Sequence, residues 1–201
     1  MVFIIGGRGF VGSAFVRLLA RRQIPYEIIT RENYATFRGR QCNILINADG
    51  NSRKFLADRD PTAEFAASVS SVVDTLHSIS FNRYILCSTC DVYPDLGDPM
   101  MNREDAEIRT DRLSRYGFHK YLAERLVRYE VDPYLIIRFG GFVGEGLKKN
   151  PIHDILHGGP LWLDPDSALQ YIRTDTAAEA VWHLVEKGLS NEIVNICGNG
   201  L

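Results

Sequence analysis

Tyr116 and Lys120 stand four residues apart in a segment whose pattern predicts a helix. Side chains at this spacing share one face of a helix, about one turn apart. An ammonium group close to a phenol favours the phenolate, so it lowers the pKa of the tyrosine from a reference value near about 10 toward working pH. The pair therefore predicts a tyrosine that donates or accepts a proton in catalysis.

Because such pairs are common on solvated helices, a second feature gives this one weight. A Gly-x-x-Gly-x-x-Gly turn, 6–12, lies between an apolar segment, 2–5, and a helical pattern, 11–22. In a dinucleotide-binding turn, the three glycines permit the tight turn, the approach of backbone to pyrophosphate and the close packing of helix on sheet. The N-terminus of the helix then faces the phosphates. The expected cofactor-binding residues of this turn are Gly6, Arg8, Gly9, Phe10, Val11 and Gly12.

The end of the second predicted strand, 26–30, bears on the choice between NAD and NADP. Dinucleotide-binding folds normally carry an acidic residue there for the adenosine ribose hydroxyls, whereas this chain has Thr30, Arg31 and Glu32. Arg31, joined by Arg8 from the glycine turn, would suit a ribose 2′-phosphate in geometry and charge. We favour NADP over NAD on this ground. The alternative is that both arginines are solvated and Glu32 reaches the ribose.

Strands and helices alternate along the chain. This alternation predicts an α/β fold, a Rossmann-type doubly wound parallel sheet with helices on both faces. We expect residues 1–139 to form an NAD(P)-binding Rossmann domain. The glycine-rich remainder, 140–201, is expected to form a small, shortened C-terminal substrate lobe interleaved with the last sheet elements. The expected strands are 2–5, 26–30, 43–47, 83–88, 134–139, 160–163, 169–173 and 192–197, and the expected helices are 11–22, 61–79, 115–130, 152–157 and 174–187.

Composition restricts the class of protein and its partners. The 201 residues are 45% hydrophobic and 24% charged, as in ordinary globular proteins. A formal net charge of -2 gives no signal for a polyanion, so we do not expect nucleic acid as a partner. No apolar run is long enough to span a bilayer, so we expect no membrane partner. The scattered cysteines indicate no disulfide framework and favour a reducing, cytoplasmic location.

Two further patterns admit a chemical use. Cys87 and Cys90 match C-x-x-C, but a redox site usually places its first cysteine at a helix N-terminus, and Cys87 ends a predicted strand. We therefore expect a packed Cys87 and a loop Cys90. His153 and His157 are four residues apart and resemble a metal pair, but no third ligand is evident, so no metal is expected.

The order of the motifs resembles that of the extended short-chain dehydrogenases/reductases, the NAD-dependent epimerase/dehydratase group. The glycine turn is followed by Ser-Thr-x-x-Val-Tyr at 88–93 and by Tyr-Gly-x-x-Lys-x-x-x-Glu at 116–124. The resemblance covers nearly the whole chain. Further segments that resemble the group are 44–48, 137–144, 171–177 and 194–196.

The resemblance implies a catalytic role for Thr89, Tyr116 and Lys120. Thr89 stands where the family has its catalytic Ser or Thr, Tyr116 at the acid/base, and Lys120 at the lysine that also binds the nicotinamide ribose. The implied chemistry is hydride transfer between C4 of nicotinamide and a substrate carbon, while Tyr116 moves the hydroxyl proton. Asp91 lies where some members place a second acid/base for epimerisation or dehydration. The alternative role for Asp91 is that of a loop cap.

The resemblance thus implies an NAD(P)-dependent oxidoreductase, epimerase or dehydratase that acts on a nucleotide sugar or a related hydroxy or keto compound. Arg8 and Arg31, with Tyr93 and Pro94, resemble the NADP-dependent reductase branch typified by GDP-fucose synthase. The family also implies a homodimer formed through its counterparts of the helices 61–79 and 115–130. A second hypothesis is a non-catalytic NADP-binding regulatory or scaffold protein of the same fold.

Overall fold

The structure is a computed structural model that describes residues 1–51, 54–161, 163–164 and 166–198. At its centre, these residues form a six-stranded sheet with the order β2-β1-β3-β4-β5-β8, in which every pair of neighbours is parallel. The fold is therefore the predicted α/β, Rossmann-type doubly wound sheet. Its strands are β1 (Val2–Ile5), β2 (Tyr26–Ile29), β3 (Gln41–Asn47), β4 (Ser80–Thr89), β5 (Tyr134–Phe139) and β8 (Glu192–Ile196).

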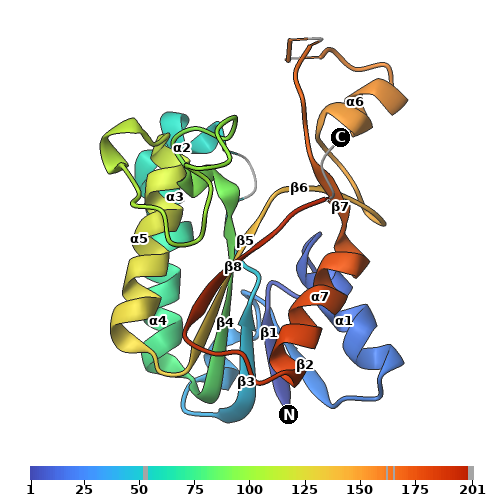
Figure 1. Cartoon of the computed structure of the whole chain (residues 1–201). Helices are drawn as coiled ribbons and strands as arrows, with labels where there is room; N and C mark the ends of the chain where they lie inside the picture. The colour runs from blue at the N-terminus through green and yellow to red at the C-terminus, as the bar shows by residue number, and fades with distance from the viewer. Residues whose placement is uncertain (52–53, 162, 165, 199–201) are drawn as a thin grey trace.

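Helices cover both faces of the sheet (Figure 1). On one face lie α1 (Gly12–Arg21) and α7 (Thr174–Glu186). On the other lies a long helical layer. Its members are α2 (Leu56–Arg59), α3 (Pro61–Phe65), the π-helical turn η2 (Ala66–Ser70), α4 (Ser71–Ser78) and α5 (Arg115–Glu130).

Side chains from alternate strand positions form two separate hydrophobic clusters. Ile4 and Ile85 pack on the side of α1 and α7, whereas Phe3 and Leu86, one position away, pack on the side of α4 and α5. Successive residues of a strand point to opposite faces, and a parallel sheet is buried on both. Full burial of each such side chain contributes about 1.5–3 kcal/mol. The apolar strands of the sequence thus hold both helical layers on one sheet.

The sheet lacks one strand of the common dinucleotide-binding order, 3-2-1-4-5-6. Among the described residues no strand lies outside β2, because the connection from β2 to β3 holds only the 3-10 turn η1 (Tyr34–Phe37). A further parallel strand would need a crossover of about a dozen or more residues, and this connection is too short for one. The absence of a predicted strand or helix at 31–42 agrees with this, except that β3 already begins at Gln41.

Two predicted helix starts are capped by side chains. The side chain of Asp60 accepts a hydrogen bond from the Ala63 N–H at 3.0 Å, which begins α3. The hydroxyl of Ser114 accepts one from the Gly117 N–H at 3.1 Å, which begins α5. Each cap satisfies a backbone N–H of the first turn. The Ser114 cap fixes the start of the helix that carries Tyr116.

The C-terminal part departs from the prediction in two places. The predicted strand 160–163 is wrong, because residues 160, 161 and 163 have no strand and residue 162 lies outside the described residues. The glycine-dense segment instead forms β6 (Gly141–Val143), which pairs with β7 (Tyr171–Arg173) in a second, two-stranded parallel sheet.

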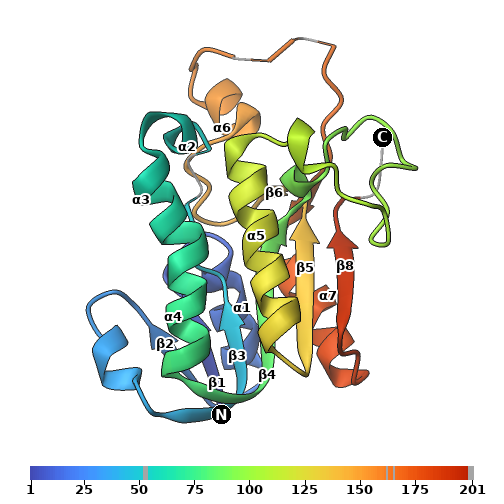
Figure 2. The same ribbon diagram turned by 90° about the vertical axis from the view of Figure 1, so that its left-hand side faces the viewer.

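This small sheet and α6 (Pro151–Leu156) lie at the end of the molecule toward which the strands of the main sheet point (Figure 2). The chain then returns through α7 and β8 to the main fold. No helix in the described part of the chain has the length and apolar character needed to cross a membrane.

Candidate functional site

The order of the strands places a topological switch point between β1 and β3. From β1 the chain moves to one edge of the sheet at β2, and from β3 it extends toward the other edge at β8. Open α/β sheets bind ligands in the crevice outside the carboxyl ends of strands at such a point. The glycine turn leaves β1 there, and the loop 48–50 leaves β3 beside it.

The glycine turn follows a path that side chains would block. Gly6 has φ +74°, and a Cβ on it would lie 2.8 Å from the carbonyl oxygen of Ala48. A Cβ on Gly12 would lie 2.2 Å from the carbonyl oxygen of Gly6. The turn closes with a hydrogen bond of 2.8 Å from the Gly9 N–H to the Gly6 oxygen. The backbone of the turn and the N-terminus of α1 therefore fit the approach of a dinucleotide.

The other residues of the turn have different surroundings. Arg8 is exposed, and Val11 packs against the hydrophobic cluster on the α1 side of the sheet. The ring of Phe10 contacts that of Phe142 in β6, with centroids 6.3 Å apart and the planes nearly perpendicular. Phe10 thus links the glycine turn to the small C-terminal sheet.

Charged side chains gather where β2 ends. The pKa of Glu32 is lowered, first by a hydrogen bond with Thr30 and further by the positive charges of Arg8 and Arg31. Both arginines and Glu32 are exposed. The two arginines predicted to contact a 2′-phosphate therefore lie close to the same carboxylate, which is also the predicted alternative partner of the ribose.

Tyr116 lies in the first turn of α5, against the segment that follows β4. A Cβ on Gly117 would lie 2.1 Å from the carbonyl oxygen of Asp91, so the glycine lets α5 approach this segment closely. Burial raises the pKa of Tyr116, and the carboxylates of Asp91 and Glu64 raise it further. The prediction that Lys120 lowers this pKa is therefore wrong for this structure, in which desolvation of the phenolate dominates.

Lys120 is 5% exposed and extends toward the main sheet. Its Nζ donates a hydrogen bond of 3.0 Å to the carbonyl oxygen of Cys87, at the end of β4. A Cβ on Gly50 would lie 3.6 Å from the same nitrogen, so Lys120 also adjoins the loop beside the glycine turn. Burial lowers the pKa of Lys120. The predicted partner of Tyr116 therefore shares its helix face but donates its hydrogen bond to β4.

Thr89 and Asp91 form a hydrogen-bonded pair at the end of β4. The Thr89 hydroxyl donates to Asp91 Oδ2 at 2.8 Å and accepts from the Asp91 N–H at 3.2 Å, which caps the 3-10 turn η3 (Cys90–Val92). Lys54 Nζ lies 2.7 Å from Asp91 Oδ1 and 6.0 Å from the centroid of the Tyr116 ring. Lys54 was not predicted, because nothing in its local sequence marks it.

A buried ion pair lies next to this segment, where Ser88, the neighbour of Thr89, donates a hydrogen bond to one of its members. Glu124 of α5 and Arg138 of β5 are both at most 2% exposed, and Arg138 Nη2 donates to Glu124 Oε2 at 2.7 Å. Although burial disfavours the cation, Glu124 raises the pKa of Arg138. The Ser88 hydroxyl donates to Glu124 Oε1 at 2.5 Å, and Arg138 Nη1 donates to the Tyr93 hydroxyl at 2.9 Å. The network joins α5 to β4 and β5.

The two other sequence patterns have structural explanations. Cys87 is buried, which raises the pKa of its thiol to about 12, and Cys90 lies in the turn after β4, as predicted. The rings of His153 and His157 stack with centroids 4.1 Å apart. Across the described ranges, no group of three His, Cys, Asp or Glu side chains is placed to hold a metal ion.

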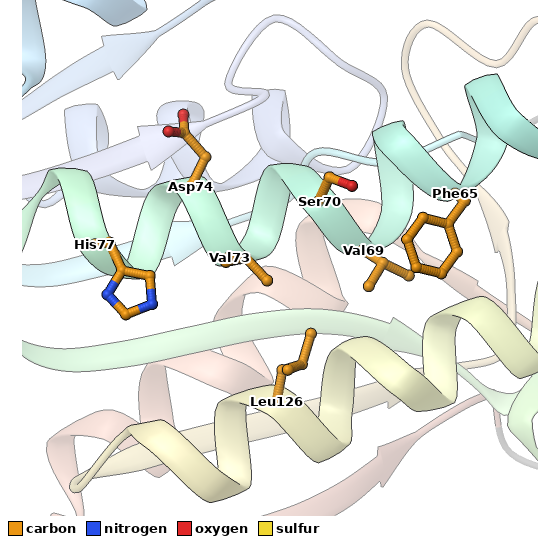
Figure 3. Close-up of a pocket in the computed structure, with 7 residues that line it drawn as sticks. All are labelled: Phe65, Val69, Ser70, Val73, Asp74, His77 and Leu126. Carbon is orange, nitrogen blue, oxygen red and sulfur yellow. The ribbon is translucent and has the colours of Figure 1, made fainter.

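A groove in the outer surface lies away from the candidate site, between the α3–α4 segment and α5 (Figure 3). Val69 and Val73 point toward Leu126 across it, whereas Asp74 points to the other side of its helix. No predicted catalytic or cofactor residue lines this groove. The lining residues are Phe65, Val69, Ser70, Val73, Asp74, His77 and Leu126.

Comparison with known proteins supplies a family. The sequence profile described as the NAD dependent epimerase/dehydratase family matches residues 37–197. A search of curated protein sequences found no match. Solved structures of the same fold are numerous. The three described below each share less than 20% sequence identity with the chain.

Three of these structures illustrate the likeness. A mutant UDP-glucuronic acid 4-epimerase from Bacillus cereus, in complex with UDP-4-deoxy-4-fluoro-glucuronic acid and NAD, is 16% identical over 98% of this chain and 77% of its own, with a TM-score of 0.79. The dTDP-glucose 4,6-dehydratase from Bacillus anthracis, in complex with NAD, is 19% identical over 99% of this chain and 76% of its own, with a TM-score of 0.78. RMD from Pseudomonas aeruginosa, in complex with NADPH, is 18% identical over 98% of this chain and 78% of its own, with a TM-score of 0.78.

Proposed function

Because the chain belongs to the NAD-dependent epimerase/dehydratase family, we propose that it is an NAD(P)-dependent oxidoreductase, epimerase or dehydratase. Its substrate in this proposal is a nucleotide sugar or a related hydroxy or keto compound. The proposal is supported by the position of these side chains along β4: Thr89 ends the strand, Tyr116 lies in the helix packed against the segment after it, and Lys120 donates a hydrogen bond to the Cys87 carbonyl within it. The loop 48–50 contacts both Gly6 of the glycine turn and Lys120, so these side chains adjoin the dinucleotide-type turn.

The cofactor proposal rests on the glycine turn and on the buried lysine. Gly6 and Gly12 leave backbone, not side chains, at the start of α1, as the approach of a pyrophosphate requires. Lys120 of α5, whose ammonium group reaches β4 at Cys87, would hold the ribose next to the nicotinamide. A bound nicotinamide dinucleotide would supply hydride transfer to or from a substrate carbon.

The proton chemistry follows from the surroundings of Tyr116. Its raised pKa keeps the phenol protonated near neutral pH, so Tyr116 would donate a proton to a substrate oxygen in the reductive direction. The Thr89 hydroxyl would orient that oxygen. To accept a proton in the oxidative direction, Tyr116 must first become a phenolate, which a nearby cation favours. Lys120, one helical turn away, would supply that charge by turning toward the phenol from Cys87. Asp91, held by Lys54, is the proposed second acid/base.

We favour NADP as the cofactor, on the ground of Arg8 and Arg31. Both are exposed at the end of β2 and close to Glu32, so a 2′-phosphate would meet two guanidinium groups there. The same residues are the reason to propose a reductase of the kind typified by GDP-fucose synthase. In this proposal, Arg31→Ala weakens the binding of NADP and leaves that of NAD unchanged.

We also propose a homodimer built on the groove of Figure 3. The exposed apolar surface of Phe65 and the half-buried side chains of Val73 and Leu126 line this groove, so a second copy would cover them. In this proposal, residues 140–201 form a small, shortened lobe that binds the substrate. The four cysteines are free, in keeping with the proposed cytoplasmic location.

A second candidate function is a non-catalytic protein that binds NADP and acts through partners. The contact of Lys120 with the Cys87 carbonyl favours it, because this ammonium group already has a hydrogen-bond partner in the main sheet. The raised pKa of Tyr116 points the same way.

Cofactor binding and turnover distinguish the two candidates. We expect NADP to raise the Tm of the wild-type chain and of the control Gly97→Ala, but not of Gly12→Val, whose side chain would fill the turn. We also expect wild-type protein with NADPH to turn over a compound in a panel of nucleotide sugars and their keto derivatives. A Tm shift without turnover would favour the non-catalytic candidate. If neither NADP nor NAD raised the Tm of the wild-type protein, both candidate functions would be rejected.

A further inference from the structure

Two thiols from distant parts of the chain meet beside the candidate site. Cys90 is the first residue of η3, after β4, and Cys197 directly follows β8. Their sulfur atoms lie 3.5 Å apart. Between the two strands lies β5, whose Arg138 carbonyl oxygen is 3.6 Å from Cys90 Sγ. The contact therefore spans the carboxyl ends of three neighbouring strands.

The separation of the sulfurs is close to that of a bond. A disulfide has an S–S length of about 2.05 Å, so the two atoms need to approach by about 1.5 Å. Both cysteines are free and partly exposed, so a small oxidant can reach them. A Cβ on Gly140 would lie 2.9 Å from Cys197 Sγ. The glycine at the end of β5 thus leaves the room that the Cys197 thiol occupies.

The surroundings of the two thiols assign them different roles. The contact with Cys90 lowers the pKa of Cys197, with a further contribution from the Gly140 N–H, although burial acts in the opposite direction. The same contact raises the pKa of Cys90. Burial raises the pKa of Cys42 to about 11 and that of Cys87 to about 12. Of the two thiols, Cys197, whose pKa is lowered and which lies next to the Gly140 N–H, is therefore the better candidate for the attacking thiolate.

We propose that Cys90 and Cys197 are an oxidisable pair that a hydroperoxide converts to a disulfide at the edge of the candidate site. In the first step the Cys197 thiolate attacks the outer oxygen of the hydroperoxide, the O–O bond breaks, and a sulfenic acid and an alcohol (water, for hydrogen peroxide) form. In the second step the Cys90 sulfur attacks the sulfenic sulfur, the S–O bond breaks, and hydroxide leaves with the Cys90 proton as water. Two thiols and one hydroperoxide thus give one disulfide, one alcohol and one water.

The disulfide would act on the residues next to Cys90. Thr89 and Asp91, the proposed orienting and acid/base residues, flank it in the chain and are hydrogen-bonded to each other. Drawing Cys90 toward the end of β8 would move the turn η3 that holds this pair. We therefore expect oxidation to lower turnover, a consequence that rests on the proposed function, whereas formation of the bond does not.

Peptide mapping tests the bond without any need for activity. The 201-residue chain is treated with hydrogen peroxide, its remaining thiols are alkylated, and it is digested without reduction for mass spectrometry. We expect a peptide pair that joins Cys90 to Cys197, with the mass of two hydrogens lost, and its disappearance after dithiothreitol. A Cys87–Cys90 link in its place, or oxidation without any link to Cys197, would overturn the proposal.

Single variants test the two roles. In Cys90→Ser the sulfenic acid at Cys197 has no resolving thiol, so a 1,3-diketone reagent should label Cys197. In Cys197→Ser the Cys90 thiol should stay reduced, and the matched control Cys42→Ser should form the link at the wild-type rate. Equal oxidation of Cys90 in Cys197→Ser and in wild-type protein would contradict the assignment of Cys197 as the attacking thiol.

Turnover during the same peroxide treatment tests the consequence for the site. Activity should fall in step with the mapped link in wild-type protein and in Cys42→Ser, and persist in Cys197→Ser. A complete link with unchanged turnover would overturn the effect on the site. Absence of turnover before treatment would instead be a failure of the proposed function, which the mapping result does not share.

Discussion

At the scale of single residues, the candidate site is a short relay of polar groups. Lys54 contacts Asp91, and Asp91 accepts a hydrogen bond from Thr89. The Lys54 ammonium also lies over the ring of Tyr116. Lys54 is therefore a positioning residue in our account, because it fixes the carboxylate that in turn holds the threonine hydroxyl.

Replacing this lysine should weaken catalysis modestly. Lys54 is largely exposed, and an exposed ion pair contributes about 0.2–1 kcal/mol. We expect Lys54→Met to lower kcat/KM by about two- to fivefold, and Lys54→Arg to restore most of it because it keeps the charge. The control is Lys187→Met, at the end of α7 and away from the site. An effect of Lys54→Met no larger than that of the control would contradict the role of Lys54.

The buried Lys120 should make stability depend on pH. Its pKa in the folded protein is below the reference of 10.5, so between these two values the unfolded chain binds more protons and stability rises with pH. Below the folded pKa the cost of the buried ammonium is fully present. Lys120→Met should therefore gain most in free energy of unfolding, relative to wild type, at about pH 7, and less at about pH 9.5. Urea unfolding at both pH values measures this, and a gain that grows with pH would contradict it.

Residue spacing predicted that Tyr116 and Lys120 lie on one helix, but it did not predict the contacts of their side chains. Tyr116 and Lys120 lie on the predicted helix, but the sequence does not reveal that the lysine extends to the Cys87 carbonyl. It also does not reveal how far the phenol is desolvated, and this reversed the expected direction of its pKa shift. Cys197 was not foreseen as the partner of Cys90, because the two meet only after six strands are in order.

At the scale of elements, α5 is held against the sheet by the buried pair of Glu124 and Arg138. Removing the charge of one partner leaves the other buried and uncompensated, which costs about 3–5 kcal/mol. We expect Glu124→Gln to lower the free energy of unfolding by this amount. The matched control is Glu179→Gln, whose ion pair with Arg21 is exposed, and its expected effect is within about 0.5 kcal/mol. Equal effects in urea unfolding would show that the buried pair does not anchor α5.

The alternation of strand and helix patterns predicted most elements of the main fold, because their apolar patterns match two-sided burial in a parallel sheet. The exceptions lie where patterns are weak. The strand β6 has only three residues, Gly141–Val143, in a segment with several glycines, so it is too short to show an alternating pattern, and it is found paired with β7. The segment 160–163 is apolar enough to suggest a strand but finds no pairing partner in its described residues. Pairing between distant segments decides such cases.

At the scale of the whole molecule, the chain is shorter than the three solved structures described above, of which it covers 76–78%. The main sheet and both helical layers are present, and the small sheet β6–β7 lies beyond the strand ends. The link from Phe10 to Phe142 brings this small sheet to the glycine turn. In our proposal, the substrate would therefore lie between the small sheet and the carboxyl ends of the strands of the main sheet.

The groove on the α3–α4 and α5 surface predicts the oligomeric state. We expect the wild-type chain to sediment as a dimer at micromolar concentration and Leu126→Asp to sediment as a monomer, because a carboxylate in the apolar groove would be buried by the second copy. The control is Leu156→Asp, on the exposed surface of α6, which should remain a dimer. A monomeric wild type, or loss of the dimer in both variants, would contradict the proposed interface.

The measurement that bears most directly on the central claim is the effect of Tyr116→Phe on turnover and cofactor binding together. The variant removes only the hydroxyl that we propose to move the proton. We expect kcat to fall by about 100-fold or more, while the rise in Tm with NADP stays as in wild-type protein. A variant that keeps wild-type kcat would contradict the assignment of Tyr116 as the acid/base.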